Sequence, residues 1–384
     1  MKNNCRTWIL FLSGILLLVA CVPGPSSQEE NETESLSARE PAATPPIEIL
    51  ATPAFEIVAA PSLTKIEMLD EQNGWGQAEG MVLRTEDGGE SWFDATPEDA
   101  FNDPAYARSA FLDEEIGWIL LEDLDSPTVG TIYRTTDGGA SWLWRNTPFG
   151  RSYIGFLDAE NGYALTGLGA GVGSEGVAIW ETKNGGGDFD RTFVHQPGLD
   201  DSLPYSGIKN GITFRDKLNG WVSGSVPQNG FIWLYRTRDG GFTWAHQGLT
   251  MPNGYENAQT SVRAPLFFDE LRGLLPIQLL AEKMAMVFYR TDDGGESWTA
   301  TLPVPTRGKF SVISGDEIVV WDGSASIFFT VDGGETWSFH ASEWLPGDIL
   351  RELDFVSATK GWALTDLGLY RTDDGGKTWE KLGD

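Results

Sequence analysis

A nine-residue phrase recurs seven times in this chain and constrains its fold more than any other feature. In its cleanest copy the phrase reads RTDDGGKTW, from Arg371 to Trp379. Each copy carries an acidic or amide residue, then two glycines, then an aromatic residue three positions after the second glycine. The copies span residues 84–92, 134–142, 181–189, 236–244, 290–298, 329–337 and 371–379.

The phrase predicts a tight hairpin turn. An Asp or Asn side chain can fold back onto nearby backbone N–H groups, and a Gly-Gly pair reaches the positive φ angles that such turns need. Threonine and serine hydroxyls can close the turn with further hydrogen bonds. We therefore interpret seven residues as structural turn formers rather than catalysts or metal ligands: Asp87, Asp137, Asn184, Asp239, Asp293, Asp332 and Asp374.

A second phrase precedes the boxes and consists of an apolar run, a short polar turn and a glycine followed by a large apolar residue. Clear copies end at Gly117-Trp118, Gly220-Trp221 and Gly361-Trp362. An aspartate recurs after the first strand of five units, namely Asp70, Asp113, Asp158, Asp216 and Asp269. This recurrence favours a turn-forming role for these aspartates over a catalytic one.

Each unit therefore reads as four short strands joined by turns. The aromatic residues that end the boxes are 39 to 55 residues apart, which is the length of a propeller blade. Closing such blades into a ring protects the sheet edges. The predicted fold class is all-β, a seven-bladed β-propeller of four-stranded antiparallel blades over residues 53–384. Ten of the 16 tryptophans belong to the two phrases, and we expect them to pack between blades.

The box phrase resembles the Asp-box repeat of the bacterial neuraminidase type. Together with the Gly-Trp phrase upstream, it makes residues 60–384 look like the photosystem II stability/assembly factor family of seven-bladed propellers. That resemblance implies a non-enzymatic protein that holds a membrane-protein precursor during assembly. Its partner would be a photosystem subunit or its precursor if the source is photosynthetic. The arginine-rich docking patch associated with the family is not matched residue by residue here.

Residues 1–21 are predicted to be a lipoprotein signal peptide. Lys2 and Arg6 precede an apolar run over residues 8–19, and Leu18-Val19-Ala20-Cys21 fits a lipobox. Cys21 would carry the lipid, and Cys5 would leave with the signal. The mature chain would then lack disulfides and thiol nucleophiles. We expect an exported protein, lipid-anchored to the outer face of the cell membrane or to the outer membrane.

Residues 22–52 are rich in Pro, Ser, Thr and Glu, and they are predicted to form a disordered acidic tether. The propeller is expected to occupy residues 53–384. The strand-like residues Phe55 to Val58 are expected to add an edge strand near the last blade and help to close the ring.

The net charge of −29 excludes several classes of partner. Removing the signal leaves 25 basic and 56 acidic residues, and such a surface repels nucleic acid and anionic lipid headgroups. The glycine pairs lie in hairpin turns and so predict no phosphate cradle and no cofactor. His195, His246 and His340 follow the repeat and predict no shared metal site. The box arginines are expected to pair with acidic neighbours: Arg84, Arg134, Arg236, Arg290 and Arg371.

Function is expected where the repeats differ. The connections Gln196–Asn210 and Gln247–Arg263 are the richest of these departures and should lie on one face of the ring. They carry the candidate docking residues Tyr205, Lys209, Tyr255 and Arg263. The resulting hypothesis is a monomeric docking module for a membrane or envelope protein.

The alternative hypothesis is a glycan-binding or glycoside-hydrolysing propeller, because Asp-box propellers include sialidases and xyloglucan-cleaving endoglucanases. Sialidases carry an Arg-Ile-Pro segment, which this chain lacks, and the endoglucanases pair two propellers around a cleft where this chain has one. Hydrolysis needs two carboxylates about 5 to 9.5 Å apart. The recurrent aspartates offer no pair that stands out from the repeat.

Overall fold

The computed structural model describes residues 55–98, 100, 107–123, 128–195, 202–343 and 348–383. The chain divides into two units, Met1–Ala51 and Thr52–Asp384. The predicted signal peptide, the lipid attachment residue Cys21 and nearly all of the 22–52 tether fall in the first unit and lie outside the described residues. No helix in the described part of the chain is long and apolar enough to span a membrane.

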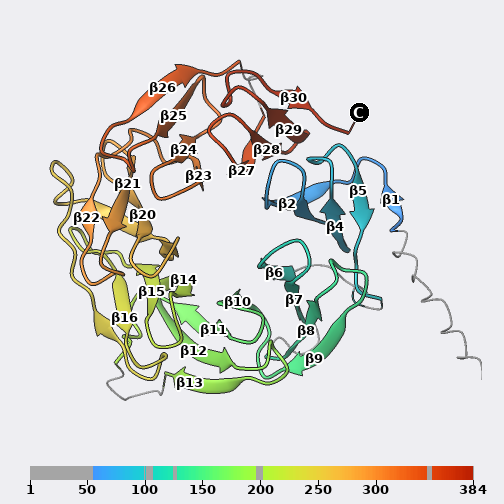
Figure 1. Cartoon of the computed structure of the whole chain (residues 1–384). Coiled ribbons are helices and arrows are strands. Elements are labelled where there is room, and N and C mark those ends of the chain that lie inside the picture. The colour runs from blue at the N-terminus through green and yellow to red at the C-terminus, as the bar shows by residue number, and fades with distance from the viewer. Residues whose placement is uncertain are drawn as a thin grey trace, which may run out of the picture. The chain divides into compact units, whose positions relative to one another are not determined.

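The second unit is a ring of seven antiparallel sheets (Figure 1), and the predicted seven-bladed β-propeller is confirmed. Within each blade, strands that are consecutive in the sequence pair with one another, so every blade is a simple meander. The first strand of each blade faces the centre of the ring and the last strand lies at its rim (Figure 1).

The first four blades follow the chain in order. Blade 1 holds β2 (Leu63–Met68), β3 (Gly74–Ala78), β4 (Met81–Thr85) and β5 (Trp92–Asp94). Blade 2 holds β6 (Ala107–Phe111), β7 (Gly117–Glu122), β8 (Gly130–Thr135) and β9 (Leu143–Thr147). Blade 3 holds β10 (Ser152–Phe156), β11 (Gly162–Gly171), β12 (Ser174–Thr182) and β13 (Asp190–Val194). Blade 4 holds β14 (Ile208–Phe214), β15 (Gly220–Ser225), β16 (Leu234–Thr237) and β17 (Ala245–His246).

The last three blades complete the ring. Blade 5 holds β18 (Gln259–Val262), β19 (Leu266–Phe267), β20 (Gly273–Leu280), β21 (Ala285–Thr291) and β22 (Thr299–Ala300). Blade 6 holds β23 (Lys309–Val312), β24 (Ile318–Trp321), β25 (Ser326–Thr330) and β26 (Ser338–Ala341). Blade 7 holds β27 (Leu350–Phe355), β28 (Gly361–Thr365), β29 (Gly368–Thr372) and β30 (Glu380–Lys381). In blade 5 the inner strand is interrupted, and β18 and β19 both pair with β20.

The Asp-box turns are held by side-chain hydrogen bonds to the backbone. In the last copy, Asp374 Oδ1 accepts the N–H of Thr378 at 2.9 Å, and Thr372 Oγ1 accepts the N–H of Gly376 at 2.8 Å. Gly375 and Gly376 have φ angles of 76° and 87°, which a residue with a side chain rarely adopts. The same bonds recur around Asp87, Asp137, Asn184, Asp239, Asp293 and Asp332.

The meander assigns the turns to two faces of the ring. The Asp-box turns join the third and fourth strands, and they share a face with the turns that join the first and second strands. The opposite face, which we call the loop face, carries the hairpins between the second and third strands and the connections between blades. The described parts of the candidate docking connections therefore lie on the loop face.

Tryptophans and arginines of the repeat join each blade to the next. The indole of Trp118 donates to the Gly185 carbonyl of the following box at 2.9 Å, and Trp362 donates to Gly88 at 2.8 Å across the closing seam. Arg236 pairs with Glu296 at 2.6 Å, and Arg371 pairs with Glu90 at 2.8 Å. Both acidic residues lie in the box of the next blade, so for these arginines the expected pairing with acidic neighbours is confirmed.

The ring closes without exchanging a strand between its ends. Two carboxylates on β27 accept backbone N–H groups of β2: Glu352 Oε2 from Ile66 at 2.8 Å, and Asp354 Oδ2 from Met68 at 2.7 Å. The additional strand β1 (Ile57–Val58) pairs with β5 at the outer edge of the first blade. Val58 packs against an apolar cluster that the first and last blades share.

Candidate functional site: a basic cleft between the fifth and sixth blades

The four candidate docking residues lie in different environments. Tyr205 is half exposed, and the N–H of Glu175 donates to its carbonyl at 2.9 Å. Tyr255 is partly buried against the apolar cluster that blades 4 and 5 share. Arg263 is exposed and follows β18. The four side chains therefore differ in how far they are exposed.

Lys209 is a correction to the sequence interpretation. Its side chain is buried, with 3% of the residue exposed, and its ammonium group donates to a ring of backbone carbonyls. These belong to Glu175 at 2.7 Å, Pro204 at 2.9 Å, Gly207 at 3.0 Å and Tyr205 at 3.2 Å, with Ser206 at 3.4 Å. Burial lowers the pKa of Lys209 to about 8, although the charge of Glu175 acts in the opposite direction. Lys209 therefore ties the 204–207 segment to β12 and offers no charge to a partner.

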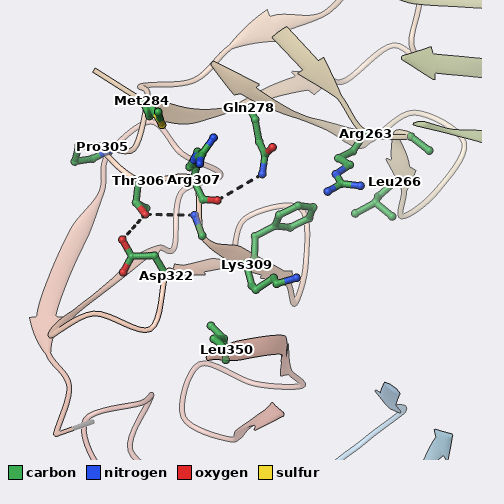
Figure 2. Close-up of a pocket in the computed structure, with 13 residues that line it drawn as sticks. Arg263, Leu266, Gln278, Met284, Pro305, Thr306, Arg307, Lys309, Asp322 and Leu350 are labelled. Atoms are coloured by element: carbon green, nitrogen blue, oxygen red, sulfur yellow. Dashed lines mark hydrogen bonds between the residues drawn. The ribbon is translucent and has the colours of Figure 1, made fainter. Parts of the chain in front are cut away.

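The strongest candidate site is a basic cleft of about 820 Å³ on the loop face, between blades 5 and 6 (Figure 2). This volume is in the range of ligand-binding clefts. Its lining comes from Arg263 to Leu266, the β20–β21 hairpin, the segment between the blades and the start of β27. The lining residues are Arg263, Ala264, Leu266, Gln278, Met284, Pro305, Thr306, Arg307, Gly308, Lys309, Phe310, Asp322 and Leu350.

The floor of the cleft is fixed by a close approach of two backbone segments. A Cβ atom on Gly308 would collide with the backbone of Trp321, so only glycine fits there. Thr306 Oγ1 donates to Asp322 Oδ2 at 2.8 Å and accepts the N–H of Gly308 at 3.3 Å. These bonds hold the segment that carries Arg307 and Lys309.

The cations of the cleft are not engaged in ion pairs with the described residues. Arg263, Arg307 and Lys309 are exposed, and within the described ranges none of them forms an ion pair. The cleft lining includes one carboxylate, Asp322. Burial opposes its ionisation, but hydrogen bonds from Ser324 and Thr306 lower its pKa below the usual value. Asp322 is thus ionised and already hydrogen-bonded, and the three cations remain available to an anion.

Apolar side chains line the rest of the cleft. Leu266 and Met284 are 40% and 47% exposed, and Phe310 and Leu350 complete this lining. Figure 2 shows Arg263 apart from Arg307 and Lys309; Arg307 precedes β23, and Lys309 is the first residue of that strand. The cleft combines three cationic groups with an apolar wall, which suits an anionic ligand that also carries apolar groups.

The other chemically active side chains of the described residues serve the fold. His195 Nδ1 accepts the N–H of Val177 at 3.0 Å, and its Nε2 contacts the Leu203 carbonyl at 2.8 Å. His246 and His340 each contact a backbone carbonyl. No cluster of three potential metal-binding side chains occurs in the part of the chain that the structure describes.

The recurrent aspartates also form turns. One oxygen of each accepts two backbone N–H groups, two and three positions further along the chain. For Asp70 the donors are Gln72 and Asn73, both at 2.7 Å. The same pair of bonds is made by Asp113, Asp158, Asp216 and Asp269. These carboxylates are occupied by their own turns.

Arg307 and Lys309 were not predicted from the sequence, although the sequence carries a signal for them. The stretch 297–315 contains both cations and no acidic residue, in a chain with 56 acidic residues. A stretch that lacks acidic residues in such an acidic chain indicates a locally cationic surface. Arg263 belongs to the neighbouring blade, so its position in the same cleft could be found only from the fold.

The sequence comparisons match the chain to repeats rather than to a whole family. Residues 370–381 match the family model "BNR/Asp-box repeat". A curated relative, "Probable oligoxyloglucan-reducing end-specific xyloglucanase" of Neosartorya fischeri, is 28% identical over 171 residues. That alignment covers 39% of this chain and 19% of the relative, so the chain spans about a fifth of the relative's length.

Solved structures that resemble the chain include both kinds of propeller. "YCF48 bound to D1 peptide" is 16% identical, with a TM-score of 0.54, and the match covers 83% of this chain and 96% of that one. The GH74 enzyme of Niastella koreensis is 14% identical, with a TM-score of 0.59, and the match covers 85% of this chain and 55% of that enzyme. At these identities the comparison shows that the chain shares the propeller fold.

Proposed function

We propose that this chain is a non-enzymatic docking module that binds an anionic segment of a partner protein in the basic cleft. The partner is an envelope or membrane protein, and the module acts as an assembly factor. The lipid at Cys21 would hold the module at the outer face of the cell membrane or at the outer membrane. This role follows the resemblance of the Asp-box and Gly-Trp phrases to the assembly-factor family.

The availability of the cleft cations carries this proposal. The box arginines Arg236 and Arg371 are paired with acidic residues of the next blade, whereas Arg263, Arg307 and Lys309 face the cleft without such partners. In a chain of net charge −29, acidic groups to pair with them are plentiful. A cluster of unpaired cations beside an apolar wall gives a partner both charge complementarity and apolar contact. The match to "YCF48 bound to D1 peptide", a propeller of the same fold that holds a peptide, supports a peptide as the ligand.

A titration of the full-length protein with a peptide of eight aspartates tests the proposal. The double variant Arg307→Gln, Lys309→Gln should weaken binding severalfold, because exposed charge pairs contribute about 0.2–1 kcal/mol each. The matched control is Lys217→Gln, Lys377→Gln, which removes the same charge from exposed turns on the opposite face. Equal losses in the two double variants, or no binding by the wild-type protein, would contradict the proposal.

Glycan binding or hydrolysis is the second candidate function, and the curated xyloglucanase relative favours it. Two acids near the centre of the ring, Glu352 and Asp354, have raised pKa values because of burial. Both, however, accept backbone N–H groups of the neighbouring blade. A panel of plant and bacterial glycans separates the functions. Turnover of any glycan that disappears in Glu352→Gln or Asp354→Asn would replace the docking proposal with a glycosidase.

A further inference from the structure

The inner strand of blade 5 carries one extra residue where it borders the basic cleft. Val262 pairs with Ile277 of β20, and the next pair joins Leu266 to Leu274. Three residues of the inner strand, 263–265, therefore lie opposite two residues of β20, 275 and 276. Such a β-bulge breaks the regular alternation of side chains along a strand.

Two prolines explain why the ladder is interrupted at this point. Pro265 and Pro276 lie on the two facing segments, and neither has a backbone N–H to donate. The N–H of Arg263 donates to the Pro276 carbonyl at 2.9 Å, which holds Arg263 opposite Pro276. The bulge thus follows from the residue types on both strands.

The bulge places Arg263 and Leu266 on the same side of the sheet. In a regular strand, residues three positions apart point to opposite faces. Here Val262 and Phe267, which flank the bulge, both pack in the apolar cluster that blades 4 and 5 share. Arg263 and Leu266 both line the cleft, and Figure 2 draws them together. The extra residue therefore gives this wall of the cleft a cation and an apolar group next to each other.

The same bulge position recurs in other blades, where its side chain is bonded within the protein. The extra residue is Thr64 in blade 1, Asn210 in blade 4 and Arg351 in blade 7, each four positions before the end of its inner strand. Thr64 and Asn210 each donate to a backbone carbonyl at 3.1 Å, and Arg351 pairs with a carboxylate. Arg263 lies four positions before the end of β19 and has no side-chain partner among the described residues. Its charge remains available to a ligand.

The spacing of Arg263 and Leu266 fits an extended peptide. The two residues lie opposite Pro276 and Leu274, which are two positions apart on β20. At about 3.3 Å per residue, their side chains leave the wall about 7 Å apart. Alternate side chains of an extended peptide have the same separation and point to one side. A peptide along this wall would place an acidic side chain against Arg263 and an apolar one, two positions away, against Leu266.

We infer that the cleft selects extended segments in which an acidic residue and an apolar residue lie two positions apart. This inference rests on the proposed function, since it names the partner segment for the same cleft. Arg263 and Leu266 set the selectivity, and Arg307 and Lys309 add charge attraction. A uniformly acidic segment binds more weakly, because it places a charge against Leu266, where removing that charge from water is costly. Either chain direction satisfies the spacing, so the order of the two residues does not matter.

Two peptides of identical composition test the inference on the full-length protein. In SDSLSDSLS, aspartate and leucine alternate two positions apart, whereas in SDLSSDLSS they fall on opposite sides of an extended chain. Calorimetric titration should show about fivefold tighter binding of the first peptide, as expected for partial burial of one leucine side chain. The variant Leu266→Thr should bring this ratio to about one, because threonine suits a strand but removes the apolar contact. Leu218→Thr, at an exposed leucine in a turn on the opposite face, is the matched control and should keep the ratio.

Equal affinities of the two peptides for the wild-type protein would overturn the inference, and this comparison needs no variant. A preference that persists in Leu266→Thr would overturn it too, as would binding of the octa-aspartate peptide alone. Each of these results leaves the docking proposal intact. If neither nonapeptide nor the octa-aspartate peptide binds, the docking proposal itself is contradicted.

Discussion

Single residues in this ring carry charges that burial makes costly. Asp354 is the clearest case, because its carboxylate is needed as an acceptor for the Met68 N–H, yet burial raises its pKa to about 6. Lys209 is the cationic counterpart, and five backbone carbonyls accept hydrogen bonds from its ammonium group. For each residue, removing the charge from water costs free energy, and the hydrogen bonds that join distant segments offset this cost. Their substitutions are therefore expected to have opposite effects.

The variant Asp354→Asn should be more stable than the wild-type protein at pH 8. Burial raises the pKa of Asp354 in the folded protein above the usual aspartate value of 3.8, so its favourable contribution is fully present below that value and is lost as the pH rises through about 6. Removing the charge should raise the free energy of unfolding by about 1–3 kcal/mol at pH 8. The difference should vanish near pH 4. Urea denaturation at the two pH values measures it, and a variant less stable at pH 8 would show that the charge itself is required.

The variant Lys209→Met should be destabilised, because it leaves buried carbonyls without a donor. A loss of about 3–5 kcal/mol in the free energy of unfolding is expected for removing a buried charged partner. The exposed Lys217→Met variant serves as the control and should change stability by less than about 0.5 kcal/mol. Equal stability of the two variants would mean that Lys209 does not hold the 204–207 segment.

Among the elements, the repeated phrases form the turns within the blades, whereas the segments that do not repeat form the cleft. The Asp-box turns are largely local, since the hydrogen bonds of their Asp and Thr side chains join residues at most four positions apart, as between Thr372 and Gly376. The segment between blades 5 and 6 follows no repeat. Its path depends on Gly308, which allows it to contact the end of β24.

The variant Gly308→Ala should distort the cleft floor. Its Cβ would meet the backbone of Trp321, so the segment must move and stability should fall by about 1–3 kcal/mol. Binding of the aspartate peptide should weaken as well, because Arg307 and Lys309 move with the segment. Gly171→Ala is the control, since nothing lies within 4 Å of the Cβ that it would add. Wild-type affinity in Gly308→Ala would show that the cleft does not depend on this close approach.

This difference between local and non-local contacts explains how much the sequence could predict. The seven turns and the blade number follow from local chemistry that each copy repeats. Lys209 was misassigned because its burial depends on how segment 202–207 folds over β12, which no short pattern encodes. The cleft was missed for the same reason: Arg263 and Lys309 line it from two different blades. The edge strand β1 was anticipated, but its pairing with β5 could not be derived.

In the second unit as a whole, the two faces of the ring differ: contacts between blades lie on the box side, and the basic cleft lies on the loop face. Indoles and arginines of the repeat join the blades on the side of the boxes, where Trp362 and Arg371 also close the seam. The loop face carries the basic cleft with its cations Arg263, Arg307 and Lys309, in a chain of net charge −29. A partner with an anionic segment would approach that face, because the remaining surface repels it.

Site-specific photo-cross-linking from the rim of the cleft tests the central claim most directly. A cross-linking residue replaces Met284 in the full-length protein, produced in the organism that makes it. A second variant replaces Phe242, which is 56% exposed on a box turn of the opposite face. The account predicts adducts from position 284 to an acidic segment of one protein, and their loss in Arg307→Gln, Lys309→Gln. Equal adducts from positions 242 and 284, or adducts that survive the loss of the two cations, would contradict it.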